Sequence, residues 1–271
     1  MIGAIAGDII GSIYERNPIK TEDFPLFHSA SRFTDDSVMS LAVAQAILGD
    51  RDYGKEMKIL GQVYPNAGYG GNFQKWIFES EIMPYNSWGN GSAMRVSPVG
   101  FAFDNTEDVL REARASAEVS HDHPEGIKGA QAVALAILLA REGSSKDEIR
   151  SNITASFFYD LDRTIEEIRP GYQFDVSCMG SVPEAIIAFL DSTDYESAVR
   201  KAISLGGDSD TQACIAGGIA EAYYKTIPST IISDVKRILP ENLLEILARF
   251  EKDHPCCDTG ELLRINHSTS L

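Results

Sequence analysis

The sequence predicts an all-α fold, built as a single helical bundle. Most of the chain carries apolar residues at helical spacing, and no run alternates apolar and polar residues before a hairpin turn. No internal repeat or low-complexity linker divides the chain. Its 271 residues, 44% of them hydrophobic and 24% charged, are enough to bury a large core. We therefore predict one domain over residues 1–255, followed by a short polar C-terminal tail over residues 256–271.

The segment 129–140 predicts a central buried helix. It is apolar nearly all round, is long for a strand and is too short to cross a membrane. Segments 185–190 and 213–224 have the same character, and the small residues of the latter would permit close helix contact. Further helices are expected over 37–48, 106–120, 145–155, 195–203 and 229–249.

The net charge of −16, from 24 basic and 40 acidic residues, argues against bulk binding of nucleic acid. A small anionic substrate stays possible if metal ions or backbone N–H groups reverse the local potential. The start of the sequence has no basic region typical of a signal peptide, and no apolar stretch reaches the roughly 18 residues of a membrane helix. We expect no membrane partner.

The four cysteines, Cys178, Cys214, Cys256 and Cys257, show neither CxxC pairs nor a spaced zinc pattern. This usage is typical of a reducing compartment and predicts a cytoplasmic protein. Cys178 lies in an apolar context, which predicts a buried, unreactive thiol.

Two turns rich in oxygen ligands precede expected helices. The first contains Thr34, Asp35 and Asp36, and the second contains Asp208, Asp210 and Thr211. Hard divalent cations prefer such ligands, and without thiolates or a histidine pair the set favours Mg²⁺ or Mn²⁺ over Zn²⁺. Four carboxylates are enough to hold two ions and activate a bridging water.

Helix capping is the competing explanation for both turns, because Asp, Ser and Thr are preferred at helix N-termini. Capping needs only one such side chain per helix, whereas each turn supplies several. The combination therefore favours a metal site over caps alone.

Three weaker patterns lie elsewhere. In the segment 7–15, Asp8 and Glu15 are seven residues apart and would share the face of a helix. The segments 68–72 and 86–95 are Gly-rich and could present N–H groups to phosphate, although ordinary turns explain the loops better when each is taken alone. His121 could contact a substrate or cap the helix that follows it.

Five motifs occur in one order: GD-x-x-GS-x-YE, TDD, GNGSAMR, SH-x-HPEG and GGDSDT. Together they resemble the ADP-ribosylglycohydrolase family, which includes the dinitrogenase reductase-activating glycohydrolase. The resemblance extends from residue 1 to about residue 224. It implies an all-α domain with two Mg²⁺ or Mn²⁺ ions in a cleft formed by loops between helices.

The resemblance also implies roles for individual residues. It makes Thr34, Asp35, Asp36, Asp208, Asp210 and Thr211 the metal ligands. It gives catalytic roles to Glu15, Asp35 and Asp208. It makes Gly70, Gly71, Asn72, Ser87, Trp88, Gly89, Asn90, Gly91 and His121 the substrate-binding residues.

The implied reaction is hydrolysis of the bond between ribose C1″ and an acceptor, with release of ADP-ribose from a protein or small-molecule conjugate. Two alternatives stay open: a two-metal phosphoester or nucleotide hydrolase, and a non-catalytic protein that binds ADP-ribose. The sequence leaves the acceptor undetermined.

Overall fold

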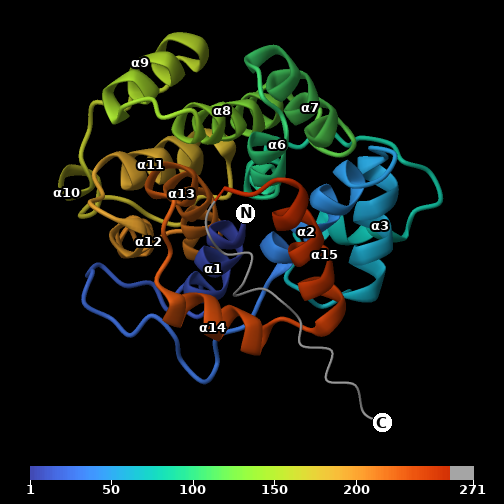
Figure 1. Ribbon diagram of the computed structural model, residues 1–271, viewed down its shortest axis with the longest axis horizontal. Coiled ribbons are helices and arrows are strands. Elements are labelled where there is room, and N and C mark those ends of the chain that lie inside the picture. Colours follow the sequence, from blue (N-terminus) through green and yellow to red (C-terminus); the bar gives the residue numbers. More distant parts are fainter. Residues whose placement is uncertain (257–271) are drawn as a thin grey trace.

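A computed structural model describes residues 1–256, and it confirms the predicted all-α class (Figure 1). These residues contain no strand, although Gly89 and Ser177 form an isolated antiparallel bridge. Apart from Cys256, the predicted tail over 256–271 lies outside the described residues. The helices are α1 (Ile2–Gly11), α2 (Asp35–Ile47), α3 (Tyr53–Val63), α4 (Gly71–Phe78), α5 (Gly91–Met94), α6 (Ser97–Ala102), α7 (Thr106–Glu118), α8 (Pro124–Arg141), α9 (Lys146–Phe157), α10 (Ile165–Ile168), α11 (Cys178–Leu190), α12 (Tyr195–Ser204), α13 (Ser209–Tyr224), α14 (Ser229–Ile238) and α15 (Glu241–Asp253).

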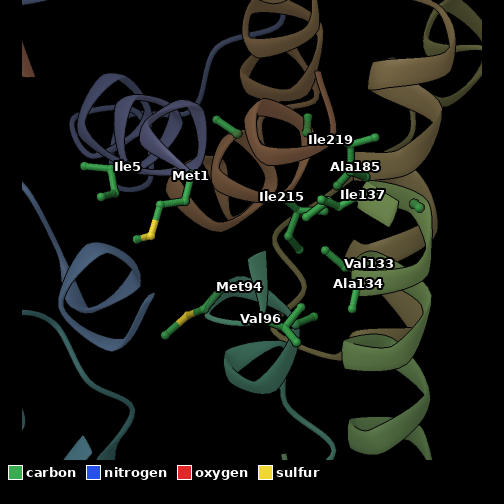
Figure 2. Close-up of a cluster of buried hydrophobic side chains, with 14 of the residues drawn as sticks. Met1, Ile5, Met94, Val96, Val133, Ala134, Ile137, Ala185, Ile215 and Ile219 are labelled. Carbon is green, nitrogen blue, oxygen red and sulfur yellow. The ribbon is translucent and has the colours of Figure 1, made fainter. Parts of the chain in front are cut away.

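Helices α1 and α13 form the centre of the bundle (Figure 1). Every residue of α1 is buried, which agrees with its apolar sequence. Figure 2 shows Ile215 and Ile219 of α13 beside Ile137 of α8, with Ile5 of α1 farther away in the same hydrophobic cluster. The predicted central helix is thus present as α8, and it shares the core with α1 and α13.

Glycines at four-residue intervals bring α1 and α13 into backbone contact. A Cβ added to Gly3 would lie 2.7 Å from the oxygen of Gly217, and one added to Gly7 would lie 2.0 Å from the oxygen of Ala213. At the end of α1, a Cβ on Gly11 would lie 2.6 Å from the Cα of Asp210. The end of α1 therefore lies directly against the first turn of α13.

Other helices cover this central pair. Helix α2 packs on α3, α6 and α15, while α8 packs on α7, α6, α9 and α11 (Figure 1). Among the helices of residues 1–256, none is both long and apolar enough to cross a membrane.

The predicted single helix over 229–249 is wrong, because the structure has α14 and α15 there. Leu239 is extended, with ψ of 136°, and Pro240 follows it. Proline disfavours the helical conformation for the preceding residue and has no N–H to donate. The chain therefore turns at this point and starts a second helix.

Other boundaries differ for a common reason: polar and small residues begin helices that apolar spacing alone does not reveal. Helix α8 starts at Pro124 rather than Gly129, and α11 starts at Cys178 rather than Ala185. Ser177 caps α11 by accepting from the N–H of Gly180 at 3.0 Å. The apolar-spacing pattern also left α1, α3, α4, α5, α6 and α10 without a prediction.

The N-terminal ammonium group of Met1 is fully buried between two acidic side chains. Its nitrogen lies 2.9 Å from Oε1 of Glu221 in α13 and 2.5 Å from Oε1 of Glu251 in α15. Burial alone would lower the pKa of the ammonium, but the two carboxylates override it and raise this pKa from 8.0 to about 11. The ion pairs join the start of α1 to α13 and α15.

This buried ammonium predicts a loss of stability at alkaline pH. Because its pKa is raised in the folded state, its contribution is complete below pH 8 and is lost as the pH rises to about 11. The loss is expected to be on the order of 4 kcal/mol in the free energy of unfolding, measured by urea titration of protein that retains Met1. Glu251→Gln removes one carboxylate partner of the ammonium, so the free energy of unfolding of this variant should fall less steeply with pH. Identical pH profiles for the variant and the wild type would contradict the assignment.

Candidate functional site

A cleft of about 620 Å³ opens where the N-terminal ends of α2, α4, α5 and α13 meet. The structure brings every site residue predicted from the sequence into the lining of this one cleft. These are Glu15, Thr34, Asp35, Asp36, Gly70, Gly71, Asn72, Ser87, Trp88, Gly89, Asn90, Gly91, His121, Asp208, Asp210 and Thr211.

The two acidic turns, far apart in the sequence, converge in the cleft. Ligand oxygens of Asp8, Asp36 and Asp210 all lie within 4.8 Å of one another. A second group within the same limit consists of Glu15, Asp208 and Asp210. Asp210 belongs to both groups, so the carboxylates form a continuous acidic cluster at the ends of α2 and α13.

Burial makes this cluster electrostatically costly when no cation is bound. Burial raises the pKa of Asp35 to about 8, with a further contribution from the charge of Asp8. Burial and neighbouring carboxylates also raise the pKa values of Asp36, Asp208 and Asp210. A divalent cation among these oxygens would reverse the effect by favouring the ionised forms.

The donor set fits a hard cation. The two groups contain only carboxylates, and Mg²⁺ and Mn²⁺ prefer oxygen ligands. Oδ1 of Asp36 is buried and accepts no hydrogen bond from any described residue. A buried carboxylate oxygen without a partner is unfavourable, so this atom is available as a ligand.

The capping alternative explains part of the first turn. Thr34 does cap α2, with its hydroxyl accepting from the N–H of Asp36 at 3.3 Å. Asp208, at the corresponding position of α13, makes no side-chain cap. Capping therefore accounts for the threonine of one turn and leaves the carboxylates of both turns unexplained.

Asp8, which the sequence analysis paired with Glu15 but did not name as a metal ligand, belongs to the acidic cluster. It is fully buried on α1, and its carboxylate accepts from the N–H and hydroxyl of Thr34 at 3.0 and 2.6 Å. It also accepts from the N–H and hydroxyl of Ser37. The sequence signal for this role is a single charged residue within an otherwise apolar helix. A buried charge needs polar partners, so such a residue indicates a polar site.

Glu15 reaches the cleft by a different route from the one predicted. Helix α1 ends at Gly11, so Asp8 and Glu15 do not share the face of one helix. Glu15 lies instead in the bend after α1, and its carboxylate lies beside those of Asp208 and Asp210. The predicted helical face was wrong, although both residues contribute to the cluster.

The first Gly-rich loop ends in α4. Gly70 is the N-cap of this helix, and a Cβ added to either Gly70 or Gly71 would meet no atom within 4 Å. There is therefore open space beside both glycines, which line the cleft at the start of a helix, and a helix start favours an anion.

The second Gly-rich loop is held by the segment that precedes α11. The N–H of Asn90 donates to the oxygen of Val176 at 2.8 Å, and the N–H of Cys178 donates to the oxygen of Trp88 at 3.0 Å. Cys178 is buried, as expected, and burial raises the pKa of its thiol to about 12. The side chain of Asn90 donates to Oδ2 of Asp208 at 2.7 Å, which links this loop to the acidic cluster.

His121 faces the cleft and does not cap a helix. It is His123 whose ring accepts from the N–H of Glu125 at 3.1 Å at the start of α8. Other cleft residues that the sequence did not single out are Arg16, Arg32, Phe73, Tyr85, Phe174 and Val176.

Comparison with known proteins identifies the family. The model of the ADP-ribosylglycohydrolase family matches residues 1–257. The chain belongs to the ADP-ribosylglycohydrolase family. The resemblance that the five motifs carry is thereby confirmed, and it extends through α14 and α15 as well.

Named relatives of this ADP-ribosylglycohydrolase family member are similar along most of their length. ADP-ribosylhydrolase ARH3 of Gallus gallus is 29% identical, and the match covers 83% of this chain and 84% of the relative. ADP-ribosylhydrolase ARH3 of Homo sapiens is 28% identical, with the same shares covered. A solved structure described as an ADP-ribosylglycohydrolase-related protein complex has a TM-score of 0.70 at 23% identity, covering 93% of this chain and 95% of that one, which supports the fold.

Proposed function

We propose that this protein hydrolyses the bond between ribose C1″ and an acceptor and releases ADP-ribose, with two Mg²⁺ or Mn²⁺ ions as cofactors. The observation that carries the proposal is the convergence of two acidic turns in a cleft lined by two Gly-rich loops. Membership of the ADP-ribosylglycohydrolase family supports ADP-ribose as the substrate moiety.

We assign the residues as follows. Thr34, Asp35, Asp36, Asp208, Asp210 and Thr211 would hold the ions. When bound, the cations would supply Lewis acidity to a water and to ribose hydroxyls. Glu15 would move a proton to or from the water or the leaving group, since its carboxylate lies beside Asp208 and Asp210.

The Gly-rich loops would bind the diphosphate and the ribose. Gly70, Gly71 and Asn72 offer the N-terminus of α4, where N–H groups and the helix dipole favour a negative group. The loop from Ser87 to Gly91, with His121 beside it, would form the opposite wall. This placement lets an anionic substrate bind despite the acidic overall charge of the protein.

The acceptor is expected to be a protein side chain or a small-molecule conjugate. The similarity to relatives named ADP-ribosylhydrolase supports an ADP-ribosyl conjugate, rather than a phosphoester, as the substrate. Selectivity would then depend on the residues at the mouth of the cleft, such as Arg16, Arg32 and Phe174.

The decisive test is a turnover panel of ADP-ribosyl conjugates of arginine, serine and small molecules, each with Mg²⁺, Mn²⁺ or a chelator. Release of ADP-ribose that requires a metal supports the proposal. Release of AMP or inorganic phosphate would instead indicate a phosphoester hydrolase. Tight binding of ADP-ribose without turnover of any conjugate would indicate a binding protein.

Asp8→Asn is expected to weaken Mn²⁺ binding about 10- to 100-fold, because residues that orient metal ligands commonly have effects of this size. The amide that replaces the carboxylate keeps one acceptor oxygen and turns a donor toward the N–H groups of Thr34 and Ser37. Titration of free Mn²⁺ by electron paramagnetic resonance measures the affinity without turnover. Asp147→Asn, at a side chain that is 89% exposed, is the matched control, and equal affinities for the two variants would contradict the role of Asp8.

A further inference from the structure

Behind one wall of the cleft, Arg95, Ser120 and His121 form a buried chain of hydrogen bonds. Nη2 of Arg95 lies 2.9 Å from Oγ of Ser120 and 2.8 Å from the carbonyl oxygen of Ser116. Oγ of Ser120 lies 2.8 Å from Nδ1 of His121. Arg95 and Ser120 are fully buried, so water does not compete for these bonds.

Chemistry fixes the direction of each bond in this chain. A guanidinium group can only donate, so Oγ of Ser120 accepts from Arg95. The hydroxyl has a single hydrogen, and the partner that the described residues offer for it is Nδ1 of His121. A buried hydroxyl hydrogen without an acceptor is costly, so Ser120 donates to Nδ1, which is then unprotonated.

The histidine ring is therefore neutral and protonated on Nε2. Burial, reinforced by the charge of Arg95, lowers the pKa of His121 well below its usual value. Burial also lowers the pKa of Arg95 to about 10, which leaves its guanidinium charged at neutral pH. The side-chain hydrogen bonds of Arg95 go to the carbonyl oxygen of Ser116 and the hydroxyl of Ser120, and neither partner carries a charge.

The protonated nitrogen faces the second Gly-rich loop. A Cβ built on Gly91 would lie 3.0 Å from Nε2 of His121, and one built on Gly89 would lie 3.6 Å away. A side chain at Gly91 would crowd this edge of the ring, and His121 lines the cleft together with both glycines.

We propose that Arg95 and Ser120 are positioning residues that hold His121 as the Nε2–H tautomer, so that the ring donates a hydrogen bond to ADP-ribose in the cleft. The first part concerns the protein alone, while the second rests on the proposed function. On the cleft side, this neutral ring can donate a hydrogen bond but cannot accept one, and it carries no charge. It would therefore favour a ligand that places an acceptor oxygen opposite Nε2.

Ser120→Ala and Ser116→Ala form a matched pair for the test. Both serines are fully buried and one helical turn apart, and the hydroxyl of Ser116 donates to the oxygen of Ala113 outside the chain. Long-range proton–nitrogen NMR of ¹⁵N-histidine protein reads the tautomer without any ligand, with His121→Asn used to assign the signal. Calorimetry with ADP-ribose measures binding.

We expect the Nε2–H tautomer in the wild type and in Ser116→Ala, and a mixture of tautomers in Ser120→Ala. We also expect ADP-ribose to bind about tenfold more weakly to Ser120→Ala than to Ser116→Ala, as for the loss of one well-oriented hydrogen bond. An Nδ1–H tautomer in the wild type, or the same tautomer and affinity in both variants, would overturn the inference. If the wild type does not bind ADP-ribose with either metal, the proposed function fails, and the ligand-free spectra still decide the role of Ser120.

Discussion

Replacing both Asp208 and Asp210 by alanine is expected to reduce the metal-dependent release of ADP-ribose by at least about a thousandfold. The change removes two carboxylates of the acidic cluster, including the one that its two groups share. A thousandfold corresponds to about 4 kcal/mol of transition-state stabilisation, within the several kcal/mol that a bound cation supplies. Single-turnover assays at saturating metal, with folding checked by circular dichroism, measure the effect.

The double substitution also removes buried negative charge, so the folded protein should be at least as stable as the wild type without metal. Both aspartates have pKa values raised by burial, and alanine has no charge to desolvate. Asp147→Ala, at an exposed position of α9, should leave turnover unchanged. Retained hydrolysis in the double variant would rule out the metal assignment.

Gly7→Ala is expected to lower the free energy of unfolding by about 3 kcal/mol or more, the upper range for overpacked cores. The added Cβ would lie 2.0 Å from the carbonyl oxygen of Ala213 and 2.4 Å from its carbonyl carbon. These are backbone atoms, so no change of rotamer relieves the clash and α1 must move away from α13. Alanine would otherwise gain about 1 kcal/mol over glycine within a helix, and the clash outweighs this gain.

Gly218→Ala is the matched control, since it also places alanine between α1 and α13. Its Cβ would lie 3.4 Å from the Cβ atoms of Ala4 and Ser97, an ordinary contact. This variant should match the wild type or exceed it by up to about 1 kcal/mol in urea unfolding. Equal stabilities for the two variants would show that the close approach at Gly7 does not constrain the helix pair.

The residues of the cleft could be predicted from sequence to a large extent. Chemically distinctive residues in turns, such as Thr34–Asp36 and the turn before Gln212, stand out because helical packing does not require them. A helix start gathers side chains and N–H groups in a small volume. That these turns converge depends on the tertiary structure, which no single turn reveals. The resemblance carried by the five motifs in order was what predicted it.

Other features depend on contacts that no local pattern encodes. Asp8 is recognisable as a site residue only when Thr34 and Ser37 are seen around its carboxylate. The break between α14 and α15 was foreseeable from Pro240, but the continuous apolar spacing on both sides concealed it. Arg95 belongs to the GNGSAMR motif, but no local pattern indicates its contact with Ser120, which lies 25 positions along the chain.

The glycine-lined contact between α1 and α13 has a consequence for biosynthesis. The ribosome delivers α1 before α13 and α15, and the partners of Met1 are 220 and 250 positions later in the chain. Until α13 has been synthesised, the apolar surface of α1 has no partner helix to cover it and can cause aggregation. The contact between α1 and α13 can therefore form only after α13 has been synthesised, and the acidic cluster, which draws on residues of α1, α2 and α13, can be completed only then.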